Sequence, residues 1–255
     1  MKYNFIKTSI EQHVYTLTLA RPGKRNAFTP TMVNEINYAI AEANFNKDVR
    51  LVLINAEGPV FCAGMDMKTF ENPVLDILNP AIQNQNISLA DAIGQLNKPS
   101  IAIVEGDVIA GGFLIILECT YIFASKEAKF SLPEVKRGLF PFQVLASLLK
   151  NMPSNKAIDL CITAKVISAS EAKNIGIVYD YLEESNLTSL MTSIIENAPQ
   201  AIYSGFEAMK KLGTLSEKEK MPFLLQCLED LKQTKDAKEG MAAFFEKRAA
   251  NWTNE

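Results

Sequence analysis

Short apolar runs alternate with segments of helical spacing along most of this chain. Residues 51–54 and 101–104 have the length and composition of buried strands. Upstream of both, Thr29 and Pro30 suit the N-cap and the first position of a helix. Apolar residues then recur at helical spacing, at Met32, Val33, Ile36, Ala39, Ile40 and Ala43. This alternation predicts an α/β fold in which helices cross over between strands.

A glycine-containing loop follows each of the two apolar runs. The first loop spans residues 61–67 and includes Met65, and the second spans residues 106–112 and includes Gly111. Each loop leads into a predicted helix, so the backbone N–H groups of Met65 and Gly111 are candidates to point into one shared pocket. Two such donors form an oxyanion hole. Each preorganised N–H aimed at a developing negative oxygen typically contributes about 3 to 4 kcal/mol.

Glu134 is the side chain best suited to move a proton beside these donors. We expect an apolar surround formed by Leu114, Leu132, Phe140 and Phe142. Desolvation there raises a carboxyl pKa towards the range in which the group takes and returns a proton near neutrality. The structural alternative is that Glu134 caps a helix beginning near Pro141 or pairs with Lys136 or Arg137. The two donor loops favour catalysis, in a reaction that stabilises an enolate.

Several short motifs occur in a fixed order along the chain. They are residues 14–19, Arg21-Pro22, Asn26-Ala27-Phe28, Lys98-Pro99, Arg137-Gly138-Leu139, 167–172, 176–178, 239–240 and 244–248. With the two loops and Pro133-Glu134-Val135, this set resembles the crotonase superfamily, also called the enoyl-CoA hydratase/isomerase family. The resemblance covers nearly the whole chain. It implies a spiral of ββα turns at residues 1–195, which holds an acyl-CoA site, and a C-terminal helical region at residues 196–255.

The resemblance also implies roles for individual residues. The N–H groups of Met65 and Gly111 would hold the thioester oxygen of an acyl-CoA, and Glu134 would be the acid and base. The predicted contacts to CoA and to the acyl chain are Lys24, Arg25, Ala27, Ala63, Asp66, Lys68, Leu114, Phe140 and Phe142. Among these, the two phenylalanines would narrow the acyl pocket. For Asp66, a structural position at a helix N-terminus is favoured over direct catalysis.

Leu114 is the departure from the family pattern that bears most on the reaction. Hydratases of the family carry a second glutamate at this position, whereas leucine neither orients water nor donates a proton. A single Glu134 therefore favours double-bond isomerisation over hydration. Hydration with one carboxylate, decarboxylation of a malonyl-type thioester and a non-catalytic acyl-CoA-binding oligomer remain alternatives. Glu118 lies four residues further on, predicted on the same helical face. It either replaces the missing carboxylate, has a buried partner or faces a subunit interface.

Composition and charge exclude several other classes of protein. A chain of 255 residues with 48% hydrophobic content can bury a large core. The net charge of −3 and the absence of a basic stripe argue against nucleic-acid binding. The apolar runs are too short to span a membrane. The four cysteines lack CxxC spacing, and no signal segment is evident, so we expect a cytoplasmic protein with free thiols.

The remaining expectations concern cofactors, partners and the segment between the two loops. His13 is the only histidine, so a histidine triad or metal cluster is not expected, and enolate stabilisation requires no metal or redox cofactor. Cys62 is interpreted as a packing residue. The family resemblance implies a trimer or a hexamer. Residues 71–96 are rich in Asn, Gln and Pro, and we interpret them as a partly helical wall of the substrate pocket.

Overall fold

Two β-sheets organise the chain, and the computed structural model describes all residues, 1–255. The first sheet contains β1 (Ile6–Glu11), β2 (Val14–Leu19), β3 (Leu51–Ala56), β5 (Ser100–Val104), β7 (Tyr121–Ala124) and β10 (Asp180–Tyr181), in this order. Only β1 and β2 pair in antiparallel fashion. The second sheet contains β4 (Val60–Cys62), β6 (Asp107–Ile109), β8 (Lys129–Ser131) and β9 (Val166–Ser168), with β9 antiparallel to its neighbour.

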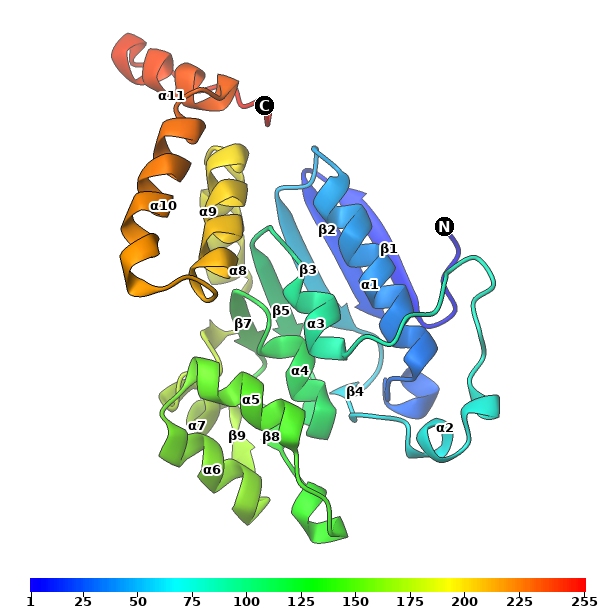
Figure 1. Cartoon of the computed structure of the whole chain (residues 1–255). Helices are drawn as coiled ribbons and strands as arrows, with labels where there is room; N and C mark the ends of the chain where they lie inside the picture. The colour runs from blue at the N-terminus through cyan, green and yellow to red at the C-terminus, as the bar shows by residue number, and fades with distance from the viewer.

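The chain builds both sheets at once by a spiral path. Three times in succession, one strand joins the first sheet and the next strand joins the second, as β3 and β4, β5 and β6, and β7 and β8. Helical segments follow each pair: α2 (Met67–Glu71), then η3 (Ala110–Gly112) with α4 (Phe113–Ile116), then η4 (Glu134–Arg137) with α5 (Phe142–Asn151). This arrangement confirms the predicted α/β spiral of ββα turns (Figure 1).

Helices cover both faces of the six-stranded sheet. On one face lie α1 (Pro30–Phe45), α3 (Leu89–Gly94) and α4, in the main hydrophobic core. On the other face α8 (Glu184–Ile195) contributes Ile194 to a smaller cluster with Leu51 and Phe123. The predicted start of α1 is confirmed, because the Thr29 side chain accepts a hydrogen bond from the Met32 N–H at 3.2 Å. All six apolar residues of the predicted face are buried.

The rest of the chain is mostly helical, and its last residues return to the segment before β3, where the Asn254 amide donates to the Lys47 carbonyl. It contains α6 (Ser154–Thr163), α7 (Ala169–Asn174), α9 (Pro199–Leu212), α10 (Glu217–Leu231) and α11 (Lys235–Glu246), and two short helical turns, η1 (Pro22–Lys24) and η2 (Pro73–Leu75), lie nearer the N-terminus. Ser168 and Ser216 precede α7 and α10, and their N–H groups donate to Glu171 and Glu219, three residues further on. No helix has the length and hydropathy required to cross a membrane.

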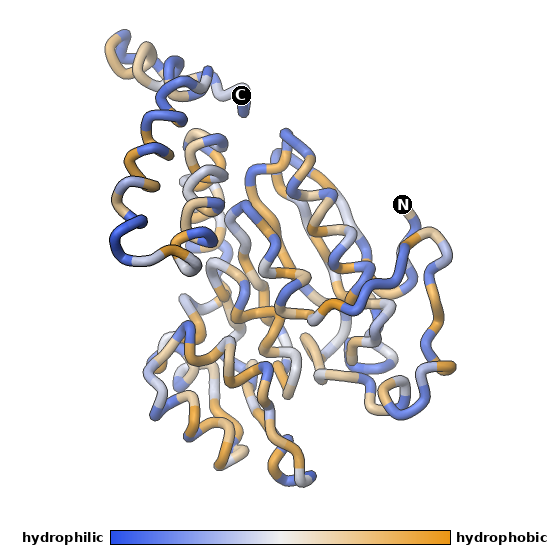
Figure 2. The backbone as a smooth tube through the Cα atoms, viewed as in Figure 1, coloured by the Kyte–Doolittle hydropathy of each residue, from blue (hydrophilic) through white to orange (hydrophobic).

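The C-terminal helices carry apolar side chains that the single chain leaves uncovered. Figure 2 shows hydrophobic positions recurring along α10 and α11, which extend beyond the sheets in Figure 1. Met221 and Leu225 of α10 are exposed, as are Phe244 and Phe245 of α11. Helix α8 ends at Ile195, next to the predicted boundary between core and helical region. The division into two parts and the trimeric or hexameric assembly stay predictions.

Candidate active site

Met65, Gly111 and Glu134 follow three neighbouring parallel strands. Strand β4 pairs with β6, and β6 pairs with β8, all running in the same direction. The carboxyl ends of parallel strands meet at one edge of a sheet, where ligand sites of α/β proteins commonly form. The two donor loops and Glu134 therefore leave the same edge of the four-stranded sheet, although they are far apart in sequence.

Glycine allows the two loops to touch. A Cβ atom built on Gly64 would lie 3.1 Å from the Gly111 nitrogen, and one on Gly112 would lie 2.7 Å from the Cys62 carbonyl oxygen. Gly64 also has a φ of +88°, which side-chain-bearing residues rarely adopt. Ala110 reaches a φ of +52° despite its side chain. The tight contact thus brings the backbone of Gly111 against the loop that carries Met65.

The backbone around Met65 leaves one N–H group without a protein acceptor. Phe28 and Met65 form an isolated parallel bridge, in which the Phe28 N–H donates to the Gly64 carbonyl and the Asp66 N–H donates to the Phe28 carbonyl, both at 2.9 Å. The N–H of Met65 itself takes part in neither bond and has no other acceptor in the chain. Because this N–H group has no acceptor in the chain, it is available to an oxygen atom of a ligand.

Glu134 opens the short helix η4 and is only half-buried, but one of its oxygens is fully enclosed. Its Oε2 atom has no hydrogen-bond partner. Desolvation raises the pKa of Glu134, and this effect exceeds the opposing ones from its own backbone N–H and from the charge of Arg137. Glu134 forms no ion pair with Lys136 or Arg137, and no side chain caps α5. Neither the helix cap nor the salt bridge of the structural alternative is formed, although the charge of Arg137 acts on Glu134.

The cysteines near this edge are protonated packing residues. Cys62 is fully buried, and burial raises the pKa of its thiol to about 12 despite a hydrogen bond from the Gly64 backbone. Cys161 on α6 is also buried, and burial together with the charge of Glu134 raises its pKa to about 11. All four cysteines are free, as predicted. A thiolate nucleophile at this edge is not supported, because thiolates form at lowered pKa values.

The two segments that carry the predicted CoA contacts Arg25 and Ala63 lie side by side. The Ala63 N–H donates to the Arg25 carbonyl at 3.0 Å, which aligns the segment containing Ala27 with the segment containing Met65. Lys24, Arg25 and Lys68 are exposed and form no ion pairs within the chain. Their charges are thus free to meet an anion, and their role as phosphate contacts stays a prediction.

Asp66 has the structural position expected of it. It caps α2 by accepting a hydrogen bond from the Lys68 N–H at 3.2 Å, and it forms an ion pair with Arg21 at 2.8 Å. Desolvation opposes ionisation of Asp66, but the hydrogen bond and charge of Arg21 hold its pKa below the usual value. Its carboxylate is therefore committed to the fold of the loop.

Asn26 of the motif Asn26-Ala27-Phe28 is a positioning residue, a role to which the motif alone does not point. It is fully buried in the left-handed conformation, with φ of +51°. Its side-chain amide donates to the carbonyls of Glu57 and Val60, each at 2.8 Å, and its Oδ1 accepts from the Arg21 N–H. Asparagine tolerates this conformation better than most residues, so its place after two basic residues was an available signal of a tight turn.

The apolar residues predicted around Glu134 have different environments. Leu114 is 2% exposed within α4. Phe140 is half-buried against the core, and its ring lies 5.0 Å from that of Phe142. Phe142 is 75% exposed, so in the single chain it does not enclose a pocket. The roles of these three residues in holding an acyl chain stay predictions.

Glu118 does not lie on a shared helical face with Leu114. Helix α4 ends at Ile116 after a single turn, so the predicted helical relation between the two residues is wrong. The expectation of a partner is confirmed: Glu118 accepts a hydrogen bond from the Ser147 hydroxyl at 2.9 Å and lies 3.6 Å from the Lys150 ammonium. Helix α5 therefore binds this carboxylate.

A cavity of about 230 Å³ opens beside Met65. It is lined by Phe28, Pro30, Val33, Asn34, Met65, Phe70, Gln143 and residues 85–89. Part of the segment 71–96 thus forms a wall of a cavity at the first donor loop. The segment is partly helical, as predicted, because it contains η2 and α3.

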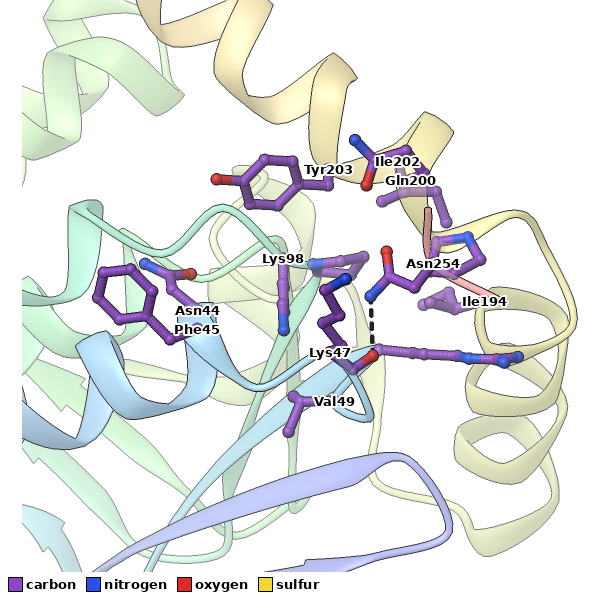
Figure 3. A pocket seen from close by; sticks show the side chains of 13 residues that line it. Asn44, Phe45, Lys47, Val49, Lys98, Ile194, Gln200, Ile202, Tyr203 and Asn254 are labelled. Carbon is purple, nitrogen blue, oxygen red and sulfur yellow. Dashed lines mark hydrogen bonds between the residues drawn. The ribbon is translucent and has the colours of Figure 1, made fainter. Parts of the chain in front are cut away.

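A different cavity, of about 190 Å³, lies at the opposite end of α1, where the C-terminal tail and α9 meet the core (Figure 3). The Asn254 amide donates there to the Lys47 carbonyl at 2.7 Å. Lys98 is buried, and its ammonium donates to the carbonyls of Ala43 and Asn46 at the end of α1. Burial lowers its pKa to about 8, although the charge of Asp48 opposes this. Lys98 therefore caps the C-terminal end of α1, away from the two donor loops and Glu134.

Comparison with known proteins agrees with this geometry. The family model described as enoyl-CoA hydratase/isomerase matches residues 9–255. An enoyl-CoA hydratase of Mycobacterium tuberculosis is 32% identical over 251 residues, which cover 95% of this chain and 94% of that protein. The (E)-benzylidenesuccinyl-CoA hydratase of Thauera aromatica is 30% identical, with 96% of this chain and 97% of the relative covered.

Solved structures show the same similarity over full length. An enoyl-CoA hydratase subunit from Geobacillus kaustophilus has a TM-score of 0.84 and 29% identity, with both chains covered completely. An enoyl-CoA hydratase/isomerase from Mycobacterium abscessus has a TM-score of 0.86 and 27% identity, again over both complete chains. The fold, the order of the loops and the family match lead to one assignment. The chain belongs to the enoyl-CoA hydratase/isomerase family, the crotonase superfamily.

Proposed function

We propose that this chain shifts the double bond of an unsaturated acyl-CoA, with Glu134 as its only acid and base. The observation that carries the proposal is the unpartnered, enclosed oxygen of Glu134 at the edge shared with the two donor loops. The neighbouring carboxylates are already bound, Asp66 to Arg21 and Glu118 to Ser147. Family membership supports a CoA thioester as the substrate.

The reaction needs one base and one oxyanion site. The N–H groups of Met65 and Gly111 donate to the thioester oxygen, and the Glu134 carboxylate removes a proton from the carbon next to the carbonyl. The electrons of that C–H bond spread into a dienolate, whose charge the two donors stabilise. Glu134 then returns the proton two carbons further along the chain. The double bond moves next to the carbonyl, and no atom is gained or lost.

Hydration of a 2-enoyl-CoA is the second candidate, and the relatives favour it. Those that are 30% to 32% identical are named as hydratases. In this case Glu134 would be the only carboxylate that activates water, and backbone groups would hold the water molecule in place. Leu114 argues against this reaction, because it is buried and offers no hydrogen bond to water.

Parallel assays of the full-length protein distinguish these reactions. We expect conversion of 3-hexenoyl-CoA to the 2-enoyl product and slower hydration of crotonyl-CoA. Hydration faster than isomerisation would assign the second function. Absence of both reactions would contradict the proposal and direct attention to decarboxylation of malonyl-type thioesters, or to binding of acyl-CoA without turnover.

Leu114→Glu tests the single-carboxylate interpretation directly. A second carboxylate beside Glu134 should raise the ratio of hydration to isomerisation by about 10- to 100-fold, since a positioned acid or base contributes at least that much. The ratio is measured with the same two substrates. Leu114→Gln is the matched control, because it has similar size but does not ionise. An unchanged ratio in a folded Leu114→Glu protein would show that position 114 does not face the reacting carbons.

A further inference from the structure

Helix α1 presents a buried polar face in addition to its apolar one. Thr31, Asn34 and Glu35 lie at helical spacing and are 1%, 3% and 0% exposed. Buried polar groups require partners. Asn79 and Gln85 supply some of those of Glu35 and Asn34, and Asp76 accepts from the Thr31 backbone N–H, whereas the Thr31 hydroxyl has no partner. The segment 76–85 continues into the wall of the cavity beside Met65.

Two of these contacts fix the beginning of the segment. The Asp76 carboxylate accepts a hydrogen bond from the Thr31 N–H at 2.8 Å, at the N-terminus of α1 where an acid is favoured. The Asn79 amide donates to Glu35 at 2.7 Å. The Glu35 carboxylate also accepts from the N–H groups of Asn4 and Phe5, so the buried charge is satisfied by three donors.

Asn34 holds the segment at the point where it enters the cavity. Its Oδ1 accepts a hydrogen bond from the Gln85 N–H at 2.7 Å, and its Nδ2 donates to the Gln85 carbonyl at 3.2 Å. One side chain thus pairs with both backbone groups of Gln85, as a neighbouring strand would. Residues 85–89 then line the cavity together with Met65 and Asn34 itself.

We propose that Asn34 is a positioning residue, which fixes residues 85–89 as the wall of the acyl pocket. This inference rests on the proposed function, because it takes the cavity beside Met65 as the place of the acyl chain. No charged residue lines that cavity, and this suits a neutral acyl chain. A wall fixed before binding lowers the entropic cost of ordering it around the substrate, and this lowers KM.

Helix α1 also supplies a matched control. Asn44, ten residues further on, donates to the Gln95 carbonyl at 2.9 Å and accepts from the Asn97 N–H at 2.8 Å. Ten residues of helix place it about 15 Å from Asn34. Asn44 lines the cavity of Figure 3 and not the one beside Met65. The two asparagines therefore make the same type of contact at two different places.

The test compares Asn34→Ala with Asn44→Ala in the full chain. We expect Asn34→Ala to speed hydrogen exchange of the Gln85 amide, the one N–H of residues 85–89 with a protein acceptor. We also expect it to raise KM for 3-hexenoyl-CoA about 10-fold with little change in kcat, the factor expected for one or two lost hydrogen bonds. For Asn44→Ala we expect faster exchange confined to residues 95–97 and an unchanged KM. If the alanine variant does not fold, Asn34→Asp replaces it in the test. This variant keeps the acceptor for the Gln85 N–H and loses only the donor to the Gln85 carbonyl.

Three results would overturn the inference. They are unchanged exchange of the Gln85 amide in Asn34→Ala, faster exchange without a rise in KM, and an equal rise in KM in both variants. Hydrogen exchange needs no substrate. A wild-type protein without acyl-CoA turnover would therefore refute the proposed function by itself, while the exchange of the Gln85 amide would still decide whether Asn34 holds this wall.

Discussion

Glu134→Gln is expected to lower kcat for the isomerisation of 3-hexenoyl-CoA by about 10²- to 10⁴-fold, the usual contribution of a positioned acid or base. Glutamine fills nearly the same space but cannot take a proton from carbon. The loops that contain Met65 and Gly111 are untouched, so binding of the thioester should change little. The measurement is kcat and KM for the purified variant beside the wild type.

Folding stability should not fall with this activity. Burial raises the pKa of Glu134, so the folded state binds a proton more tightly there than the unfolded chain does. Above that raised pKa the ionised carboxylate therefore reduces folding stability. Its replacement by glutamine should leave the urea midpoint unchanged or higher. Glu118→Gln is the control, because Glu118 is already bound by Ser147 and Lys150 and should keep kcat. A decrease in kcat of less than tenfold in Glu134→Gln would contradict the assigned role.

The same carboxyl group sets the expected pH dependence. The ionised form of Glu134 starts the reaction, so activity declines as the pH falls through its pKa. Because that pKa is raised, the decline should begin above the pH at which an ordinary glutamate, with a pKa of about 4.3, protonates. The pH profile of kcat/KM measures this limb. If kcat/KM of the wild type declines only around the pKa of an ordinary glutamate, the assignment of Glu134 as the base is contradicted.

Gly112→Ala is expected to lower kcat by about 10²- to 10³-fold, the cost of losing one oxyanion donor. Its new methyl group would lie 2.7 Å from the Cys62 carbonyl oxygen and 3.0 Å from the Cys62 Cβ, so the two loops must separate. Gly111 is the next residue, and its N–H would move with the loop. Overpacking of this kind should also reduce folding stability by about 1 to 3 kcal/mol.

Gly205→Ala is the control for that substitution. Gly205 lies within α9 with no heavy atom within 4 Å of an added Cβ, so alanine should raise stability by about 0.5 to 1 kcal/mol and leave kcat unchanged. Denaturant unfolding and steady-state kinetics measure both effects. If Gly112→Ala loses stability but retains kcat, the contact between the loops serves the fold alone.

Much of the fold followed from local signals. The apolar runs at 51–54 and 101–104 became β3 and β5, and Thr29 began α1 as its residue type predicts. The order of strand, glycine-containing turn and helix is local as well, which is why Met65 and Gly111 could be placed between a strand and a helix, although Gly111 itself lies in η3. Neighbouring parallel strands end at one edge, so the pairing of β4 with β6 places the segments that carry Met65 and Gly111 close together.

Features that depend on distant residues were not predictable in this way. Strands β4 and β6 are only three residues long and depend on pairing with each other, so they have little pattern of their own. Helix α4 stops after one turn, which the apolar run around Leu114 does not indicate. The polar face of α1 is buried only because a segment about fifty residues further on covers it, as Asn34 and Gln85 show.

The spiral path has a consequence for how activity arises during folding. The proposed catalytic groups come from three consecutive ββα turns, and the strands that align them pair only across long stretches of chain. Contacts between distant residues form slowly, because the intervening chain must first lose its freedom. A fragment that lacks any one of these turns lacks one of the three proposed groups. Recovery of turnover after dilution from denaturant should follow the completion of the third turn, with no activity from any earlier state.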